Sequence, residues 1–149
     1  MDGLILQDWV TVRGAAGATV TRVVQSELAW ADLAAYRDVV AWLEVREWSA
    51  DAGVAVQLQY QTAVARDEGL FVSLASVNLA VGVTVTPILA ATATVPLARF
   101  MRWSLAPVTP STTNPWDATF RILVAANRPA RSRLQPSDEA RLVGPSASR

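Results

Sequence analysis

Short segments in which apolar side chains alternate with polar or small ones recur along most of this chain. The clearest covers residues 54–61, where Val54, Val56, Leu58 and Tyr60 alternate with Ala55, Gln57, Gln59 and Gln61. A period of two is typical of a β-strand with one buried face. Segments of similar character lie at 9–13, 18–24, 39–48, 71–74, 81–86, 92–95, 100–105 and 118–124. The pattern predicts eight or nine short strands.

Residues that favour turns separate these segments. Gly14 and Gly17 flank a loop between two of them, and Pro87, Pro96 and Pro107 lie where strands should end or bend. Proline has no N–H to donate to a strand ladder, so it is expected at such places. Many short strands without regularly intervening helices favour a sandwich over an α/β fold. We therefore predict an all-β fold, an antiparallel β-sandwich of eight or nine strands that is jelly-roll-like or galactose-binding-like.

One segment competes for a helical assignment. It begins at Ser26, which is a suitable helix N-cap, and Leu28, Asp32 and Tyr36 follow at helix-like intervals. We expect either an irregular loop or a short helical segment of one to three turns near residues 28–37, and then a strand.

The composition changes at the end of the last predicted strand. Residues 128–149 contain five arginines and three prolines, without any sustained apolar period. Such a segment cannot bury enough apolar surface to form a core. We expect a sandwich domain at 1–127 and an extended or disordered C-terminal arm at 128–149. The residues of the arm expected to contact a partner are Arg131, Arg133, Leu134, Arg141 and Leu142.

The charge content is low for a small soluble domain. Charged residues make up 17% of the chain and hydrophobic residues 52%, against about 25% charged in an average domain. Either other subunits cover part of the surface, or alanine, which tolerates exposure, raises the apolar count. Thirteen arginines balance thirteen acids, so no net field attracts nucleic acid or a membrane. We expect no signal peptide and no transmembrane segment.

The chain lacks the residues that perform most protein catalysis. It has no histidine, no cysteine and no lysine, which removes the usual general bases, nucleophiles and soft metal ligands. Asp51, Asp67 and Glu68 are acids that glycoside hydrolysis would require, but Asp67 and Glu68 are adjacent in a predicted turn. We expect a protein that is not an enzyme and that has no metal site or cofactor.

Six tryptophans are the remaining candidates for a binding role. Trp42 and Trp48 share strand parity with Glu44 and Arg46, opposite the apolar face of residues 39–45. Aromatic rings on a β-surface serve as platforms for sugar rings or for a partner protein. A bulge near Trp48 would instead turn that ring inward, and Trp116 at a strand entrance could simply close the sandwich end. The candidate contacts are Trp42, Glu44, Arg46, Trp48, Trp116 and Asp117.

Residues 38–128 resemble small jelly-roll β-sandwich modules of tailed-phage virions. The residues that carry the resemblance are Gln61-Thr62-Ala63, Asp67-Glu68, Phe71, Arg102-Trp103 and Phe120-Arg121-Ile122. The resemblance implies a structural subunit on the virion surface, of the capsid-decorating or minor head type, which acts by binding other protein subunits. Similar sandwiches also occur as carbohydrate-binding modules, so a glycan that stacks on the surface tryptophans is the alternative partner.

Overall fold

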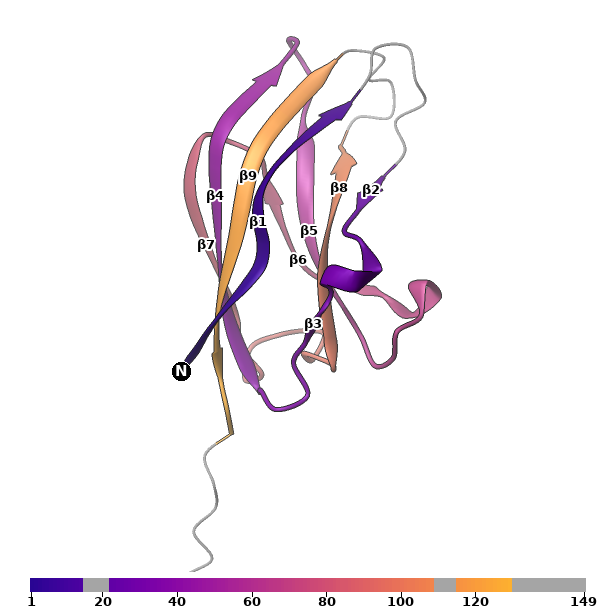
Figure 1. The fold of residues 1–149 in the computed structure, drawn as a ribbon, viewed down its shortest axis with the longest axis vertical. Helices are drawn as coiled ribbons and strands as arrows, with labels where there is room; N and C mark the ends of the chain where they lie inside the picture. The colour runs from indigo at the N-terminus through magenta and orange to yellow at the C-terminus, as the bar shows by residue number, and fades with distance from the viewer. Residues whose placement is uncertain (15–21, 109–114, 130–149) are drawn as a thin grey trace, which may run out of the picture.

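The computed structural model describes residues 1–14, 22–108 and 115–129. These form two antiparallel β-sheets packed face to face (Figure 1), which confirms the predicted all-β sandwich. The first sheet, in the order β1-β9-β4-β7, consists of β1 (Asp2–Gly14), β9 (Trp116–Asn127), β4 (Asp38–Ala50) and β7 (Gly82–Ile88). The second, in the order β2-β8-β5-β6, consists of β2 (Val23–Val24), β8 (Phe100–Pro107), β5 (Val56–Ala63) and β6 (Val72–Asn78), with β3 (Ala31–Asp32) also paired to β8.

The two short strands β2 and β3 pair with successive parts of β8. Val23 lies opposite Leu105, and Ala31 lies opposite Met101. Counted as one interrupted edge strand, they bring the total to eight strands in two sheets, which is the strand number of a jelly roll. This arrangement supports the jelly-roll-like assignment, which stays a prediction at that level of detail.

The core lies between the sheets and is built from the inward-facing half of each alternating strand. In β4 every second residue from Val39 to Val45 is buried, and in β9 every second residue from Trp116 to Ala126 is buried. Trp103 of β8 meets Phe120 edge to face, with 5.1 Å between ring centroids. The period of two in the sequence therefore corresponds to real alternation between core and surface.

The helical segment expected near 28–37 is reduced to one turn. A 3₁₀ helix, η1 (Glu27–Ala29), is all that forms, and the Ser26 side chain makes no capping hydrogen bond. Ala31 and Asp32 instead pair with β8. The helix prediction is therefore wrong beyond its first two residues, because pairing with a distant strand overrides a weak local preference.

The strand expected at 92–95 is also absent from the described residues. The backbone N–H groups of Thr92 and Ala93 both donate to the carbonyl oxygen of Leu89, so the chain turns there instead of extending. Strand β9 ends at Asn127, and the predicted boundary between a domain at 1–127 and an arm at 128–149 stays a prediction. The arm contacts Arg131, Arg133, Leu134, Arg141 and Leu142 lie outside the described residues.

Candidate functional site

Strand register aligns apolar side chains across the outer face of the first sheet. Ile5 of β1 lies opposite Leu123 of β9, Leu123 lies opposite Trp42 of β4, and Trp42 lies opposite Val85 of β7. The next row, toward the start of β1, consists of Gly3, Ala125, Val40 and Pro87. We call these two rows the apolar half-face.

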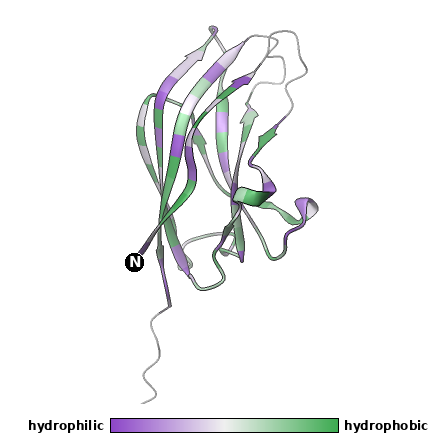
Figure 2. Cartoon of the chain, in the orientation of Figure 1, coloured by the Kyte–Doolittle hydropathy of each residue, from purple (hydrophilic) through white to green (hydrophobic). Residues whose placement is uncertain are grey.

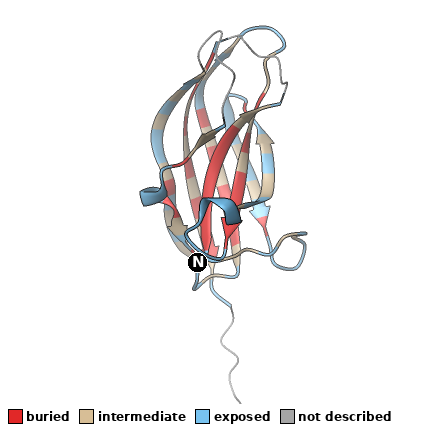
Figure 3. Cartoon of the chain, turned by 90° about the vertical axis from the view of Figure 1, so that its right-hand side faces the viewer, coloured by how far each residue is buried: buried red, intermediate tan, exposed pale blue. Residues whose placement is uncertain are grey.

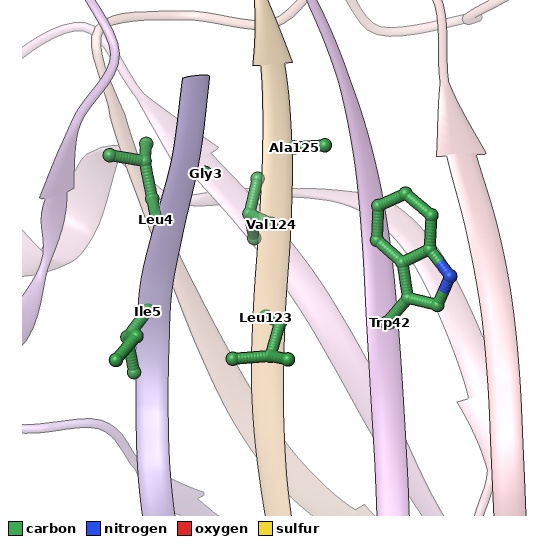
Figure 4. Close-up of a pocket in the computed structure, with 7 residues that line it drawn as sticks. All are labelled: Gly3, Leu4, Ile5, Trp42, Leu123, Val124 and Ala125. Carbon is green, nitrogen blue, oxygen red and sulfur yellow. The ribbon is translucent and has the colours of Figure 1, made fainter. Parts of the chain in front are cut away.

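The apolar half-face is open to solvent. Ile5 is 67% exposed and Val85 is 50% exposed. Figure 4 shows Ile5, Leu123 and Trp42 side by side on their three strands, around a shallow depression of about 450 Å³. Contiguous exposed apolar surface is uncommon on a monomer and usually marks a place where something binds. This surface is the strongest candidate for a functional site in the described part of the chain.

The other half of the same outer face is polar. Arg121 of β9 forms an ion pair with Glu44 of β4 at 2.6 Å, and its guanidinium lies over the Trp9 ring, 4.9 Å from the centroid. Arg46 lies over the same ring at 5.6 Å. Figure 2 shows the change along β9, which is continuously hydrophobic in its lower part and alternates above. Glu44 and Arg46 therefore lie on the same face as Trp42, as their parity predicts.

Most polar groups further along this half bind one another. The Thr11 and Thr119 hydroxyls are 2.8 Å apart, and the Thr119 hydroxyl lies 3.2 Å from a Glu47 carboxylate oxygen. Asp117 lies opposite Arg13 in the register, beside a small hollow of about 200 Å³ at the end of the sandwich. The polar half is largely satisfied internally, so the apolar half has the greater need of a partner.

Two of the three candidate tryptophans do not lie on the outer face. A bulge between Val45 and Glu47 shifts the register of β4, so Trp48 turns inward and packs against Trp116 with centroids 6.1 Å apart. Trp116 is only 3% exposed and closes the sandwich end. The prediction that Trp48 and Trp116 are surface contacts is therefore wrong. The alternatives, a bulge that turns Trp48 inward and a Trp116 ring that closes the sandwich end, are correct. Of the three candidate tryptophans, Trp42 is the one on the outer face.

Sequence reasoning missed Ile5, Leu123 and Trp9 as members of this surface. Leu123 lies within a continuous apolar run, residues 122–126, and such a run marks a strand that is apolar on both faces. From this run, the sequence could have predicted that the outer face of the last strand is apolar at Leu123. Ile5 and Trp9 gave no equivalent signal, because β1 is irregular: its register shifts between Ile5 and Gln7 and again between Gln7 and Val10.

The outer face of the second sheet is covered by its own loops over β8, whereas Val72 on the edge strand β6 is 48% exposed. Arg102 of β8 is 2% exposed, with its guanidinium 3.8 Å from the centroid of Phe71 and 5.4 Å from that of Trp30. Its Nε donates to Gln61 at 2.9 Å, and the same guanidinium pairs with Glu68. Figure 3 shows buried residues along much of this side.

The three acids considered for catalysis do not form a constellation. Glu68 pairs with Arg102, and the Asp67 carboxylate accepts from the Gly69 N–H, which caps the second 3₁₀ turn, η2 (Glu68–Leu70). Asp51 lies beside the hollow at the opposite, Trp116 end of the sandwich. Asp67 and Glu68 therefore have structural roles in the loop that covers the second sheet.

Ionic contacts hold the point where the chain leaves the first sheet. Arg128 pairs with Asp2 at 3.0 Å, and the Tyr36 hydroxyl donates to the same carboxylate at 2.9 Å. The Tyr36 hydrogen bond and then the Arg128 guanidinium lower the pKa of Asp2 below its ordinary value, because both favour the charged carboxylate. The exit point thus lies next to Gly3 and Ala125, at the edge of the apolar half-face.

In the described ranges, no three acidic side chains gather closely enough to hold a metal ion, and no helix is both long and apolar enough to cross a membrane. Comparison with known proteins finds no family model that matches the chain and no curated protein that matches it. A functional inference must therefore come from the geometry of the chain itself.

Proposed function

We propose that this chain is a non-enzymatic structural protein that takes its place in a larger assembly by docking the apolar half-face against other protein subunits, including copies of itself. The observation that carries the proposal is the aligned row of Ile5, Leu123, Trp42 and Val85 on a sheet face that no described loop covers. Removing apolar surface from water is favourable by about 25 cal/mol per Å². Docking would bury the part of this row that the monomer leaves exposed, such as Ile5 and Val85.

The proposed assembly is a phage virion, with the chain as a capsid-decorating or minor head subunit. Its support is the resemblance of residues 38–128 to virion modules. Arg102-Trp103 lies in β8, and Gln61-Thr62-Ala63 lies in β5. These residues build the core and the covered face of the second sheet, so the resemblance concerns the scaffold. The resemblance also includes Phe120-Arg121-Ile122 in β9, on the same sheet as the apolar half-face, but none of the residues of the half-face itself.

A carbohydrate partner is the second candidate, and the outward-facing Trp42 ring is the observation that favours it. Sugar sites combine an aromatic platform with polar groups that bind hydroxyls. Here the cross-strand neighbours of Trp42 are Leu123 and Val85, and the nearby Glu44 is already paired with Arg121. These surroundings fit a protein surface better than a sugar ring.

The test of protein docking is sedimentation velocity on the full chain over a wide concentration range. We expect the wild type to self-associate and Leu123→Lys to remain monomeric, because a charge in the central row has to be desolvated on docking. Thr119→Lys is the matched control, since Thr119 lies on the same face of β9 but in the polar half, and it should associate like the wild type. A wild type that stays monomeric, or a Leu123→Lys variant that associates normally, contradicts the proposal.

The sugar alternative is tested separately by tryptophan fluorescence against a panel of oligosaccharides. Saturable quenching in the wild type that is lost in Trp42→Ala would favour a glycan. We expect no quenching.

A further inference from the structure

Residues on the outer face of the first sheet match one another across its middle. The strands lie in the order β1-β9-β4-β7, so the midline of the sheet runs between β9 and β4. In the larger apolar row, Leu123 and Trp42 lie on either side of this midline (Figure 4), and the exposed Ile5 and Val85 lie at the two edges. An apolar residue on one side of the midline therefore has an apolar counterpart on the other.

The neighbouring row, in the polar half, has opposite charges on the two sides of the midline. Arg121 of β9 lies opposite Glu44 of β4 in the register and forms an ion pair with it. At one edge of this row Val83 of β7 is 62% exposed, and at the other edge the Trp9 ring lies against Arg121. A half-turn about the midline thus exchanges the positive with the negative position, and one apolar edge with the other.

Two kinds of half-turn bring this face against the same face of a second copy. An axis across the strands superimposes the two apolar half-faces and leaves the polar halves pointing away from each other. An axis along the strands, at the midline, superimposes the whole face. The second axis places every side of the midline over the opposite side of the other copy.

The area of the face distinguishes the two arrangements. At a rise of about 3.4 Å and a strand spacing of about 4.8 Å, one residue covers about 16 Å² of an antiparallel sheet. The four strands contain 13, 12, 13 and 7 residues and so cover about 730 Å², near the roughly 800 Å² per partner of a standard interface. The apolar half-face, with two outward residues on each strand, covers about a third of that. A stable contact therefore has to include the polar half, which favours the axis along the strands.

We propose that the outer face of the first sheet packs against the same face of a second copy, about a two-fold axis that runs along the strands between β9 and β4. Leu123 of each copy then lies over Trp42 of the other, and Ile5 lies over Val85. Sheets packed face to face keep their strand directions within about 30° of each other, and this axis permits that angle. The inference rests on the proposed function, since it names the occupant and the geometry of docking for the same surface.

The charged row determines the alignment of the two copies. Arg121 of one copy lies over Glu44 of the other, so each guanidinium gains a second carboxylate beside the one in its own chain. A second copy displaced by one strand would instead place Glu44 over Glu44. Like charges in contact disfavour that alignment, and complementary charges contribute more to orientation than to affinity.

Cross-linking tests the geometry directly, because the chain has no cysteine of its own. Ile5→Cys and Val85→Cys are each prepared as a single variant, mixed, and treated with a short bifunctional maleimide. We expect a covalent dimer from the mixture and little from either variant alone, because the two copies of Ile5 lie at opposite edges of the contact.

Two outcomes of the cross-linking overturn the inference and leave the proposed function standing. Efficient cross-linking of Ile5→Cys to itself shows the axis across the strands, which superimposes the two β1 strands. A mixture that associates in sedimentation velocity but gives no covalent dimer shows that a different contact holds the copies together.

The second experiment changes the charged row. Arg121→Glu gives the row two carboxylates, and Glu44→Arg gives it two guanidiniums. We expect each variant to self-associate at least about tenfold more weakly than the wild type, which corresponds to about 1.4 kcal/mol. An equal mixture should form a one-to-one dimer, because two acids then face two arginines. Arg99→Glu is the control, since Arg99 forms a similar ion pair with Asp32 on the second sheet, and it should associate like the wild type.

The result with Leu123→Lys separates the inference from the proposed function. If Leu123→Lys is monomeric while both charge variants associate normally, or if their mixture gains nothing, the polar half lies outside the contact and the inference is overturned. Thr119→Lys remains a suitable control, because Thr119 lies opposite Glu47 across the midline and its lysine would meet a carboxylate of the second copy. A wild type that stays monomeric overturns both the inference and the proposed function.

Discussion

Each outer face of the sandwich has an arginine stacked on an aromatic ring, and the two stacks differ in their exposure to solvent. On the second sheet, Arg102 stacks on Phe71 and Trp30 and is buried under the loops that carry them. On the first sheet, Arg121 stacks on Trp9, which remains 38% exposed, and no described loop crosses the apolar rows beside it. The Arg102 stack is therefore part of the packed fold of the second sheet. The Arg121 stack lies at the border of the solvent-exposed apolar half-face on the first sheet.

In this sandwich, the loops determine which outer face of a sheet is exposed to solvent. The connections that contain η1 and η2 both fold over the second sheet, where Trp30 and Phe71 meet edge to face at 4.6 Å. Their rings shield Arg102 from water. The outer face of the first sheet has apolar side chains of comparable size, and none of the described loops covers them. The uncovered rows are consequently available to another molecule.

The largest expected contrast is between the tryptophans of the two faces. Trp30 is buried and its indole N–H donates to the Gln25 carbonyl at 3.1 Å, so Trp30→Ala should lower the free energy of unfolding by about 3–5 kcal/mol. Trp42→Ala should cost about 1 kcal/mol or less, as is usual for a surface position. Urea unfolding of both variants at a concentration where the protein is monomeric measures the contrast. Similar losses would show that the two faces are equally integral to the fold.

The arginines should differ in the same direction, but less. Arg102→Met keeps much of the apolar stem and removes the charge, which leaves Gln61 without its partner at a buried position. We expect a loss of about 2–3 kcal/mol from the unpaired group and the lost ring contacts. Arg121→Met removes a partly exposed pair with Glu44 and should cost at most about 1 kcal/mol. The same urea measurements apply, and a larger loss at Arg121 would reverse the comparison.

The smallest effect is expected from two surface carboxylates, one associated with each sheet. Arg99 and then the Ala34 N–H lower the pKa of Asp32, while Tyr36 and then Arg128 lower that of Asp2. Because each folded pKa lies below the unfolded value of about 3.9, the stabilisation is complete above that pH. It is lost as the pH falls through the folded pKa.

This linkage predicts how two asparagine variants respond to pH. Asp2→Asn and Asp32→Asn should each lower Tm slightly at neutral pH and approach the wild-type Tm below the folded pKa. Thermal unfolding by circular dichroism across acidic and neutral pH makes the comparison. A Tm difference that is the same at every pH would show that the carboxylate charge is not responsible.

Local sequence patterns were sufficient to predict most of the strands and the face of the sheet on which most of their residues lie. Alternation in residues 39–45 and 118–124 correctly separates core from surface, and it places Trp42 outward. This succeeds because the direction of a side chain on a strand depends only on local backbone geometry. The same local rule led to wrong results at 92–95, where the chain turns, and near 31–36, where pairing with β8 displaces a helix.

The contacts between strands, by contrast, depend on the tertiary fold. Ile5, Leu123, Trp42 and Val85 come from four strands far apart in the chain, and they form a row because hydrogen bonding between strands sets the register. The bulge after Val45 that turns Trp48 into the core is likewise a property of the pairing with β9. Register depends on contacts across the whole sheet, and a single strand's pattern carries no information about its neighbours.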